Sequence, residues 1–216
     1  FASGALPLGF GLVLAPVLLA AAFALSALLL PPAFLVVLSV YYVTTLAYSL
    51  VLKRQAIIDV LVLAGLYTVR MMAGAAAYDV RISQWLLAFS LFIFLSLAFV
   101  KRYSELWVLR KNGVEESKGR GYRASDLEQL SSFGSAAGYL SVLVLALYVN
   151  SADVTRLYTH PERLWGILPV MLFWISRVWL LANRGQMHDD PIVFAIRDRA
   201  SYAVAAIAAA IVWWAI

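Results

Sequence analysis

Long runs of apolar residues, separated by short polar segments, dominate the pattern along the chain. Each run is close to the ~20 residues that an α-helix needs to cross the hydrocarbon core of a bilayer. We therefore predict an all-α protein, a single polytopic transmembrane helix bundle that occupies residues 1–216 and has seven spans. The predicted spans are residues 5–30, 33–52, 56–78, 83–100, 132–149, 164–183 and 200–216.

Composition supports a membrane protein and narrows its chemistry. Hydrophobic residues make up 63% of the chain and charged residues 13%, whereas a soluble domain is about half apolar and about a quarter charged. The chain has no cysteine. A disulfide framework, a thiolate zinc site and a cysteine nucleophile are therefore excluded.

The distribution of cations predicts the orientation of the bundle. With the N-terminus in the cytoplasm, the cytoplasmic segments hold 12 of the 17 lysines and arginines, the outer segments hold 3, and 2 lie within spans. This bias follows the positive-inside rule, and it predicts an integral protein of a bacterial inner membrane with a cytoplasmic active face. Because topology accounts for the net charge of +5, we expect the lipid bilayer, and not nucleic acid, as a partner.

Acidic residues are interleaved with the cations on the predicted cytoplasmic side. In the polar segment predicted at 103–129, and in the two cations before it, Lys101, Arg102, Arg120 and Arg123 flank Glu105, Asp126 and Glu128. A later polar segment adds His188, Asp189, Asp190 and Asp198. Carboxylates beside cations at the end of a helix bundle suit Mg²⁺ bound to a diphosphate, since Mg²⁺ prefers carboxylate and phosphate oxygens and cations neutralise the remaining phosphate charge.

Three ionisable residues lie inside predicted spans: Asp59, Arg70 and Arg177. An unpaired charge at mid-span costs about 2.5–3.5 kcal/mol on the lenient insertion scale, so such groups face the bundle interior, a partner or a wet cavity. For Asp59 we favour a functional role. For the two arginines a functional role and a structural tie between spans, through backbone carbonyls, stay open.

Other features have structural interpretations that remain open. Lys101 and Glu105 are four residues apart, the spacing of a surface ion pair on a helix. The small residues 73–77, AGAAA, favour close packing of their span against a neighbour.

Four stretches carry a family resemblance: YSLVLKRQAIIDVLVLAGLYTVRMMAGAAA, KRYSEL, RGYRASDL and HDDPIVFAIRDR. As an ordered set they resemble the UbiA superfamily of intramembrane prenyltransferases, and within it the decaprenyl-phosphate phosphoribosyltransferase-like branch. The resemblance covers essentially the whole chain. It implies a nine-helix bundle around a central cavity, two acidic motifs on cytoplasmic loops, and Mg²⁺ as the cofactor.

The resemblance also implies how this chain is placed within the family fold. The first residues, FASG, match a stretch that follows the first Asp-rich motif, so the chain is expected to start after that motif and to be inactive by itself. Lys53 matches a basic residue near the phosphates. The second loop departs from the family's Asp-x-x-x-Asp pattern and offers Glu105 and Asp126 instead.

The resulting hypothesis is a Mg²⁺-dependent transferase that handles a polyprenyl phosphate or diphosphate and releases diphosphate. It would prenylate a small aromatic acceptor such as 4-hydroxybenzoate, or transfer a phosphoribosyl group from phosphoribosyl diphosphate to polyprenyl phosphate. A secondary transporter or a lipid-binding scaffold is the alternative. The expected roles are phosphate binding, metal binding or orientation of the acceptor, and ordering of the catalytic cavity. The residues expected to bind phosphate are Lys53, Lys101, Arg102, Arg120 and Arg123. Glu105 and Asp126 are expected to bind metal or to orient the acceptor. Asp59 and Arg70 are expected to order the catalytic cavity.

Overall fold

The computed structural model describes residues 8–115, 119–187 and 190–216, all of it helix, turn or irregular chain, with no strand in these ranges. The α-helices are α1 (Leu8–Leu29), α2 (Pro32–Leu50), α3 (Ile58–Ala77), α4 (Gln84–Lys111), α5 (Leu127–Val149), α6 (Ala152–Leu157), α7 (Ile167–Asn183), α8 (Pro191–Arg197) and α9 (Arg199–Ala215). Three short 3₁₀ turns join them: η1 (Leu52–Arg54), η2 (Ala124–Asp126) and η3 (Pro161–Gly166).

Within the described residues, six helical segments are long and apolar enough to cross a membrane. The all-α polytopic bundle predicted from the sequence is therefore confirmed. The seventh predicted span, 200–216, is present as α9, an apolar helix of 17 residues. At 1.5 Å per residue α9 is about 26 Å long, slightly less than the ~30 Å hydrocarbon core.

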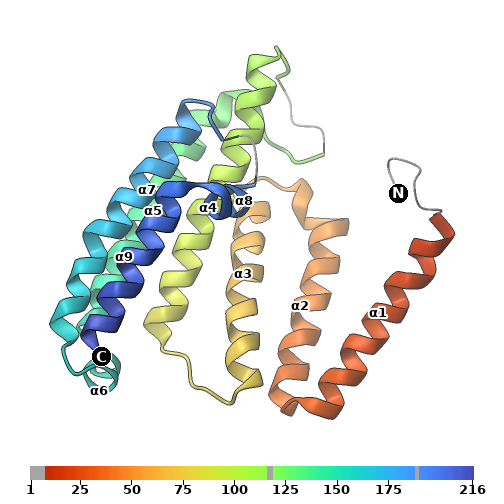
Figure 1. The fold of residues 1–216 in the computed structure, drawn as a ribbon. Helices are drawn as coiled ribbons and strands as arrows, with labels where there is room; N and C mark the ends of the chain where they lie inside the picture. Colours follow the sequence, from red (N-terminus) through yellow and green to blue (C-terminus); the bar gives the residue numbers. More distant parts are fainter. Residues whose placement is uncertain (1–7, 116–118, 188–189) are drawn as a thin grey trace.

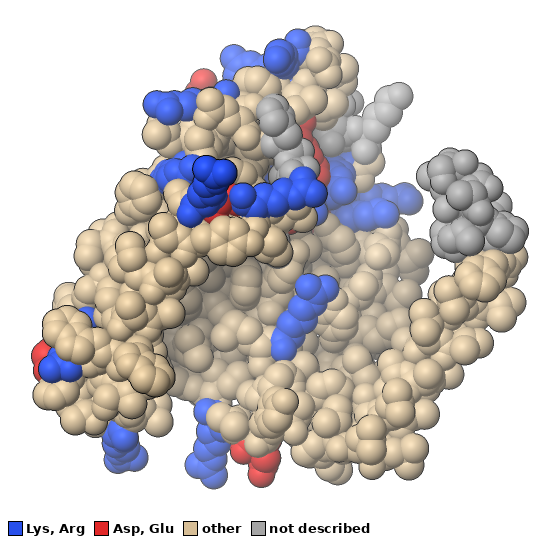
Figure 2. Space-filling view, in the orientation of Figure 1, with Lys and Arg blue, Asp and Glu red and all other residues tan. Residues whose placement is uncertain are grey.

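The long helices stand side by side with α4 near the middle (Figure 1). Helix α3 packs on one side of α4 and α5 on the other, α2 packs against α3, and α1 lies outermost against α2. Helices α7 and α9 complete the other flank, and the short α8 lies across α4. Figure 2 shows a broad hollow on this face, lined mainly by residues that carry no charge.

The tightest seam of the bundle lies between α4, α5 and α7, at two glycines of α5. A Cβ on Gly138 would lie 2.7 Å from Ile175 Cγ2 and 2.9 Å from Ser96 Oγ, and the Trp179 ring leaves no room for a Cβ on Gly134. Ser96 Oγ donates to the Gly134 carbonyl at 2.7 Å. The spacing of these glycines is the GxxxG pattern of close membrane-helix contacts.

Within the small-residue run 73–77, Gly74 does not form such a seam. A Cβ placed on Gly74 would meet no neighbouring atom within 4 Å. The close contacts of α5 depend instead on Gly134 and Gly138, which lie opposite Trp179 and Ile175.

Helix α4 is longer than the predicted span 83–100. It continues to Lys111 for a total of 28 residues, or about 42 Å, so the segment 103–129 expected as a loop begins with helix. This extension carries Arg102 and Glu105 on a rigid element that is shared with the core. Figure 2 shows lysines, arginines and acids gathered over this end of the bundle, which we call the basic end.

Candidate functional site

A buried arginine on α4 is the centre of the polar cluster at the basic end. The Arg102 side chain is 2% exposed and forms ion pairs with Asp59 and Glu105. Its Nη2 also donates to Asp59 Oδ1 and to the Tyr48 hydroxyl, both at 3.2 Å. The planar guanidinium suits such two-pronged pairing with a carboxylate, and this arrangement ties α2, α3 and α4 together.

Asp59 is fully buried in the first turn of α3. Its Oδ1 accepts a hydrogen bond from the Tyr48 hydroxyl at 2.7 Å, and both of its oxygens accept from Arg102. A carboxylate that is removed from water needs such partners, because an unpaired buried charge is strongly destabilising. The sequence-based expectation that Asp59 faces the bundle interior is therefore met, with Tyr48 as a partner that the sequence did not suggest.

Arg120 approaches the same cluster from the loop between α4 and α5. Its guanidinium lies 3.7 Å from Asp59 Oδ1 and 3.8 Å from Glu105 Oε2, both longer than a hydrogen bond. Its buried Nη1 has no hydrogen-bond partner among the described residues. The two negative charges of Asp59 and Glu105 balance the two positive charges of Arg102 and Arg120. Not all N–H groups of Arg120, however, have a hydrogen-bond acceptor among the described residues.

A cavity of about 430 Å³ adjoins this cluster and is lined by Lys53, Arg54, Gly119 and Arg120. Three of these four residues are cations. Within the described ranges, neither Lys53 nor Arg54 forms an ion pair with an acid. The volume falls in the usual range for small-molecule sites, and its lining favours a ligand with several negative charges.

The turn between α2 and α3 places this cavity beside Asp59. Ile57 has φ of 68° and ψ of −48°, and the Ile58 amide donates to the Ala56 carbonyl at 2.8 Å, which makes a γ-turn. The Ile57 amide donates to the Tyr122 hydroxyl at 2.8 Å. Burial is the main reason why the pKa of Tyr122 is raised to about 12, so this hydroxyl stays neutral at physiological pH.

Two further predicted residues lie outside the cluster. Lys101 pairs with Asp190 at 2.6 Å rather than with Glu105, so the surface pair considered from the sequence is not formed. Arg70 lies about 16.5 Å along α3 from Asp59 at 1.5 Å per residue, and it donates two hydrogen bonds to the Tyr41 hydroxyl, at 2.6 and 3.1 Å. Arg70 is thus separate from the polar cluster, and its guanidinium lies over the rings of Tyr41 and Tyr67.

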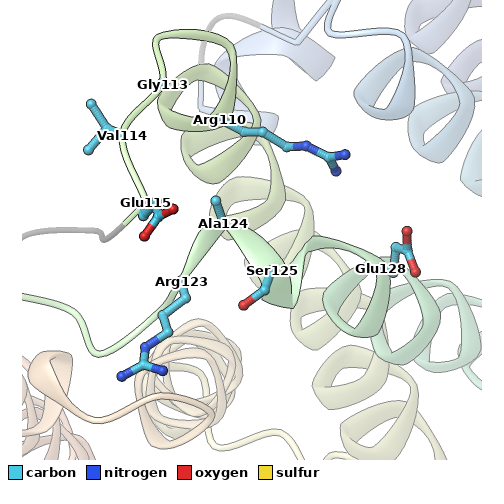
Figure 3. Close-up of a pocket in the computed structure, with 8 residues that line it drawn as sticks. All are labelled: Arg110, Gly113, Val114, Glu115, Arg123, Ala124, Ser125 and Glu128. Carbon is cyan, nitrogen blue, oxygen red and sulfur yellow. The ribbon is translucent and has the colours of Figure 1, made fainter.

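Arg123 and Asp126 belong to a different part of the basic end. Asp126 Oδ2 accepts a hydrogen bond from the Arg123 amide at 2.8 Å and stabilises the local turn. A second cavity, of about 810 Å³, lies beside this turn, and Figure 3 shows its lining residues: Arg110, Gly113, Val114, Glu115, Arg123, Ala124, Ser125 and Glu128. Its charges are of both signs, whereas the charged residues that line the smaller cavity are all basic.

Arg177, the other in-span arginine, has a structural role. Its guanidinium forms a two-pronged pair with Asp198 at 2.7 and 2.9 Å, and Asp198 also caps α9 by accepting from the Ser201 amide at 2.8 Å. Burial alone would raise the pKa of the Asp198 carboxyl, but the hydrogen bonds from Arg177 and Ser201 outweigh burial and lower it. Arg177 therefore ties α7 to α9 through a side chain and not through a backbone carbonyl.

The described residues do not by themselves build a metal cage, since they contain no group of three or more His, Asp or Glu side chains. Asp59 is buried and bonded to Arg102 and Tyr48, whereas Glu105 is 38% exposed. Mg²⁺ is usually held by one or two carboxylates together with substrate phosphates. The site fits Mg²⁺ only in that shared form, with Glu105 as the accessible carboxylate; His188 and Asp189 lie outside the described residues.

Sequence reasoning missed three residues of this site: Tyr48, Arg54 and Tyr122. Arg54 was counted only among the cytoplasmic cations that predict the orientation of the bundle. The two tyrosines carry no charge, and in a chain with 11 tyrosines nothing distinguishes them from aromatics at a membrane interface. One feature of the sequence could have indicated the tyrosines. A buried aspartate requires hydrogen-bond donors, and tyrosine hydroxyls are among the few donors that the side chains of an apolar helix offer.

No model of a protein family matches the chain, but several curated proteins are similar to it. The uncharacterized protein y4nM of Sinorhizobium fredii is 38% identical over 85% of this chain and 36% of its own length. The nodulation protein NoeC of Azorhizobium caulinodans is 34% identical over 74% of this chain and 52% of its own length. The decaprenyl-phosphate phosphoribosyltransferase of Mycolicibacterium smegmatis is 26% identical over 76% of this chain and 52% of its own length.

This chain spans between about a third and about half of the length of these relatives. The similarity supports a relation to UbiA-like transferases. The Mycolicibacterium smegmatis relative is, by its name, a transferase that acts on decaprenyl phosphate with a phosphoribosyl group.

Proposed function

We propose that this protein is an integral-membrane transferase of the UbiA type that moves a phosphoribosyl group from phosphoribosyl diphosphate to a polyprenyl phosphate. The basic cavity lined by Lys53, Arg54 and Arg120 would bind the diphosphate of the donor. The hollow, mostly uncharged face below it would hold the isoprenoid chain (Figure 2). The basic end would face the cytoplasm of a bacterium, where water-soluble phosphoribosyl diphosphate is available.

The observation that carries this proposal is the unused binding capacity around the cavity. Lys53 and Arg54 have no acidic partner among the described residues, and the Arg120 Nη1 is buried without a hydrogen-bond acceptor there. Phosphate oxygens would accept hydrogen bonds from all three side chains. Charge-assisted hydrogen bonds of this kind are about twice as strong as those between neutral groups. The names of the phosphoribosyltransferase relatives make phosphoribosyl diphosphate the preferred donor over a prenyl diphosphate.

The reaction follows from where these cations lie. An oxygen of the lipid phosphate attacks C1 of the ribose, the bond from C1 to the diphosphate oxygen breaks, and diphosphate leaves with the electron pair. Lys53, Arg54 and Arg120 would stabilise the negative charge that develops on the leaving group. Arg102 and Asp59 would hold Arg120 and the α2–α3 turn in place around it.

Mg²⁺ would be bound by diphosphate oxygens and Glu105, and it would supply Lewis-acid stabilisation of the leaving group. Lys101, engaged with Asp190, would fix α8 against α4 near the acceptor. Asp126 and Arg123 would keep the loop that carries Arg120 in its present turn. Arg70 would line the isoprenoid path.

The test is a product assay in membranes that contain the protein expressed from its natural gene. One reaction receives labelled phosphoribosyl diphosphate and polyprenyl phosphate, and a parallel one receives polyprenyl diphosphate and 4-hydroxybenzoate, each with and without Mg²⁺. We expect Mg²⁺-dependent lipid-linked product from the first pair. Product from the second pair alone would replace phosphoribosyl transfer by aromatic prenylation, and no product from either pair would exclude the transferase hypothesis in favour of a transporter or lipid-binding scaffold.

A further inference from the structure

The γ-turn at Ile57 is conformationally unfavourable for the residue that occupies it. Its φ of 68° and ψ of −48° belong to a rare, strained class of turn, and a β-branched side chain at positive φ is a genuine outlier. The other described non-glycine residue at positive φ is Asp79, a residue type that tolerates such angles. A strained turn persists only where its surroundings hold it, and such turns cluster at functional sites.

Two contacts from the loop before α5 hold this turn. The Tyr122 hydroxyl, on a residue that is 2% exposed, accepts the hydrogen bond of the Ile57 amide at 2.8 Å. One residue earlier, Gly121 has φ of 68°, and a Cβ there would lie 2.7 Å from the Arg54 carbonyl oxygen. The loop backbone therefore rests directly on the chain that connects Lys53 and Arg54 to α3.

These contacts join the two halves of the basic cavity. Lys53 and Arg54 come from the α2–α3 connection, while Gly119 and Arg120 come from the loop. Asp59, two residues after the strained turn, is the acid that both Arg102 and Arg120 approach. A change of the backbone angles at Ile57 would move Lys53 and Arg54 relative to Asp59, and would alter the spacing of the charged groups around the cavity.

We propose that Tyr122 is a positioning residue: by holding the γ-turn at Ile57 it sets the spacing between the Lys53–Arg54 cations, Arg120 and Asp59, and thereby the affinity of the cavity for a diphosphate group. The functional half of this inference rests on the proposed phosphate site. The structural half, the latch between Tyr122 and Ile57, stands independently of the reaction.

Tyr122→Phe tests the latch, because it keeps the buried ring and removes only the hydroxyl. The variant should show faster hydrogen–deuterium exchange in the peptide that covers residues 55–59. It should also bind pyrophosphate at least ~10-fold more weakly than the natural protein, measured with Mg²⁺ by calorimetry in detergent micelles, as expected for loss of about one charge-assisted contact.

The sharper test is rescue by removing the strain. Ile57 is 37% exposed, so replacing its side chain costs little packing, and glycine adopts positive φ without steric cost. Ile57→Gly in the Tyr122→Phe background should recover most of the lost pyrophosphate affinity. Ile58→Gly is the matched control, since Ile58 is 38% exposed but, as the first residue of α3, has no positive φ that glycine could relieve, and it should give no recovery. Tyr202→Phe, at an exposed tyrosine, should change neither measurement.

The outcomes separate the latch from the proposed function. Unchanged exchange at 55–59 in Tyr122→Phe would overturn the latch. Faster exchange with unchanged pyrophosphate affinity, or rescue by Ile58→Gly as well as Ile57→Gly, would overturn the positioning role. If the natural protein binds neither pyrophosphate nor phosphoribosyl diphosphate, the proposed function and the positioning role both fail, while the exchange measurement still decides whether the latch exists.

Discussion

Lys53 differs from the other described lysines at the basic end because no acid or aromatic ring in the described residues engages it. Lys101 pairs with Asp190, and Lys111 lies over the Trp107 ring. The ammonium of Lys53 lines the cavity together with two arginines, and a negatively charged ligand would reduce the repulsion among these three cations. This environment, and not the lysine itself, is the reason why we propose Lys53 as a binding residue.

Lys53→Ala should therefore weaken binding and leave the fold unchanged. A lost hydrogen bond to a charged group is worth about 1.5–3 kcal/mol, or about tenfold to a hundredfold in affinity. We expect the KM for phosphoribosyl diphosphate to rise by this factor while the thermal unfolding midpoint stays constant. Lys111→Ala, at a lysine of the same end, is the control, and an equal rise in KM for both variants would point to general electrostatics.

Asp198 gives a residue-scale prediction on stability and pH. Its pKa is lowered in the folded state by the bonds from Arg177 and Ser201 despite its burial. A lowered pKa adds stability above the unfolded value of about 3.9 and loses it as pH falls through the folded value. Asp198→Asn should lower stability by about 1–3 kcal/mol at pH 7.

The corresponding measurement is the unfolding midpoint in detergent at pH 7 and at pH 3. The gap between Asp198→Asn and the natural protein should be clear at pH 7 and should shrink toward pH 3, as the carboxyl becomes protonated. Asp79→Asn, at an exposed turn residue, should show no gap at either pH. A gap for Asp198→Asn that is independent of pH would show that charge is not the cause.

At the scale of elements, the position of α5 depends on glycines, whose lack of a side chain lets α4 and α7 approach closely. Gly138 faces Ile175 of α7 and Ser96 of α4, and Ser96 also accepts a hydrogen bond from the Trp179 indole at 3.0 Å. A methyl group at Gly138 would push apart three helices that are connected by one hydroxyl. Helix propensity, which favours alanine over glycine by about 1 kcal/mol, acts in the opposite direction and is outweighed.

Gly138→Ala should thus lower the stability of the bundle, by about 1–3 kcal/mol for overpacking of a tight seam. Gly74→Ala is the matched control, because a Cβ there meets no atom within 4 Å and the change should be neutral or slightly stabilising. The measurement is the unfolding midpoint in detergent for both variants. Equal unfolding midpoints for Gly138→Ala and Gly74→Ala would show that the seam accommodates a methyl group without loss of stability.

The elements were largely predictable from the sequence, whereas their ends at the functional site were not. Spans were found because an uninterrupted apolar run of membrane length is rare outside membrane-crossing helices. A helical pair of Lys101 and Glu105 was considered, but the extension of α4 to Lys111 was not predicted, because the side chains beyond residue 100 are largely polar and charged. The predicted span ended where the residues become polar, whereas the helix α4 itself continues beyond that point.

At the scale of the whole molecule, the fold class could be predicted from the sequence, while the pairing of distant residues came only from the structure. Asp59 was singled out because a carboxylate inside a span needs a partner. Which of the cations would be that partner depends on how α3 and α4 pack, which no local pattern specifies. The same applies to Lys101 and Asp190, which are 89 residues apart.

The orientation of the bundle remains a prediction that the chain makes easy to test. The absence of native cysteine allows single cysteines to be introduced at Val80, 61% exposed, and Val114, 41% exposed, at opposite ends of α4. A membrane-impermeant maleimide should label Val80→Cys in intact cells and Val114→Cys only after the cells are opened. The reverse pattern would place the basic end outside and would contradict a cytoplasmic donor.

The pairing around Arg102 has a consequence for proton transfer. Both carboxylates of the cluster already accept hydrogen bonds from an arginine, and arginine does not give up its proton in proteins. Neither carboxylate is therefore free to act as a general base, and we expect the attacking lipid phosphate to supply its own ionised oxygen. The rate of transfer should rise as that phosphate loses its second proton near pH ~6 and then stay level at higher pH. The pH dependence of the rate would therefore follow the ionisation of the substrate and not that of a side chain.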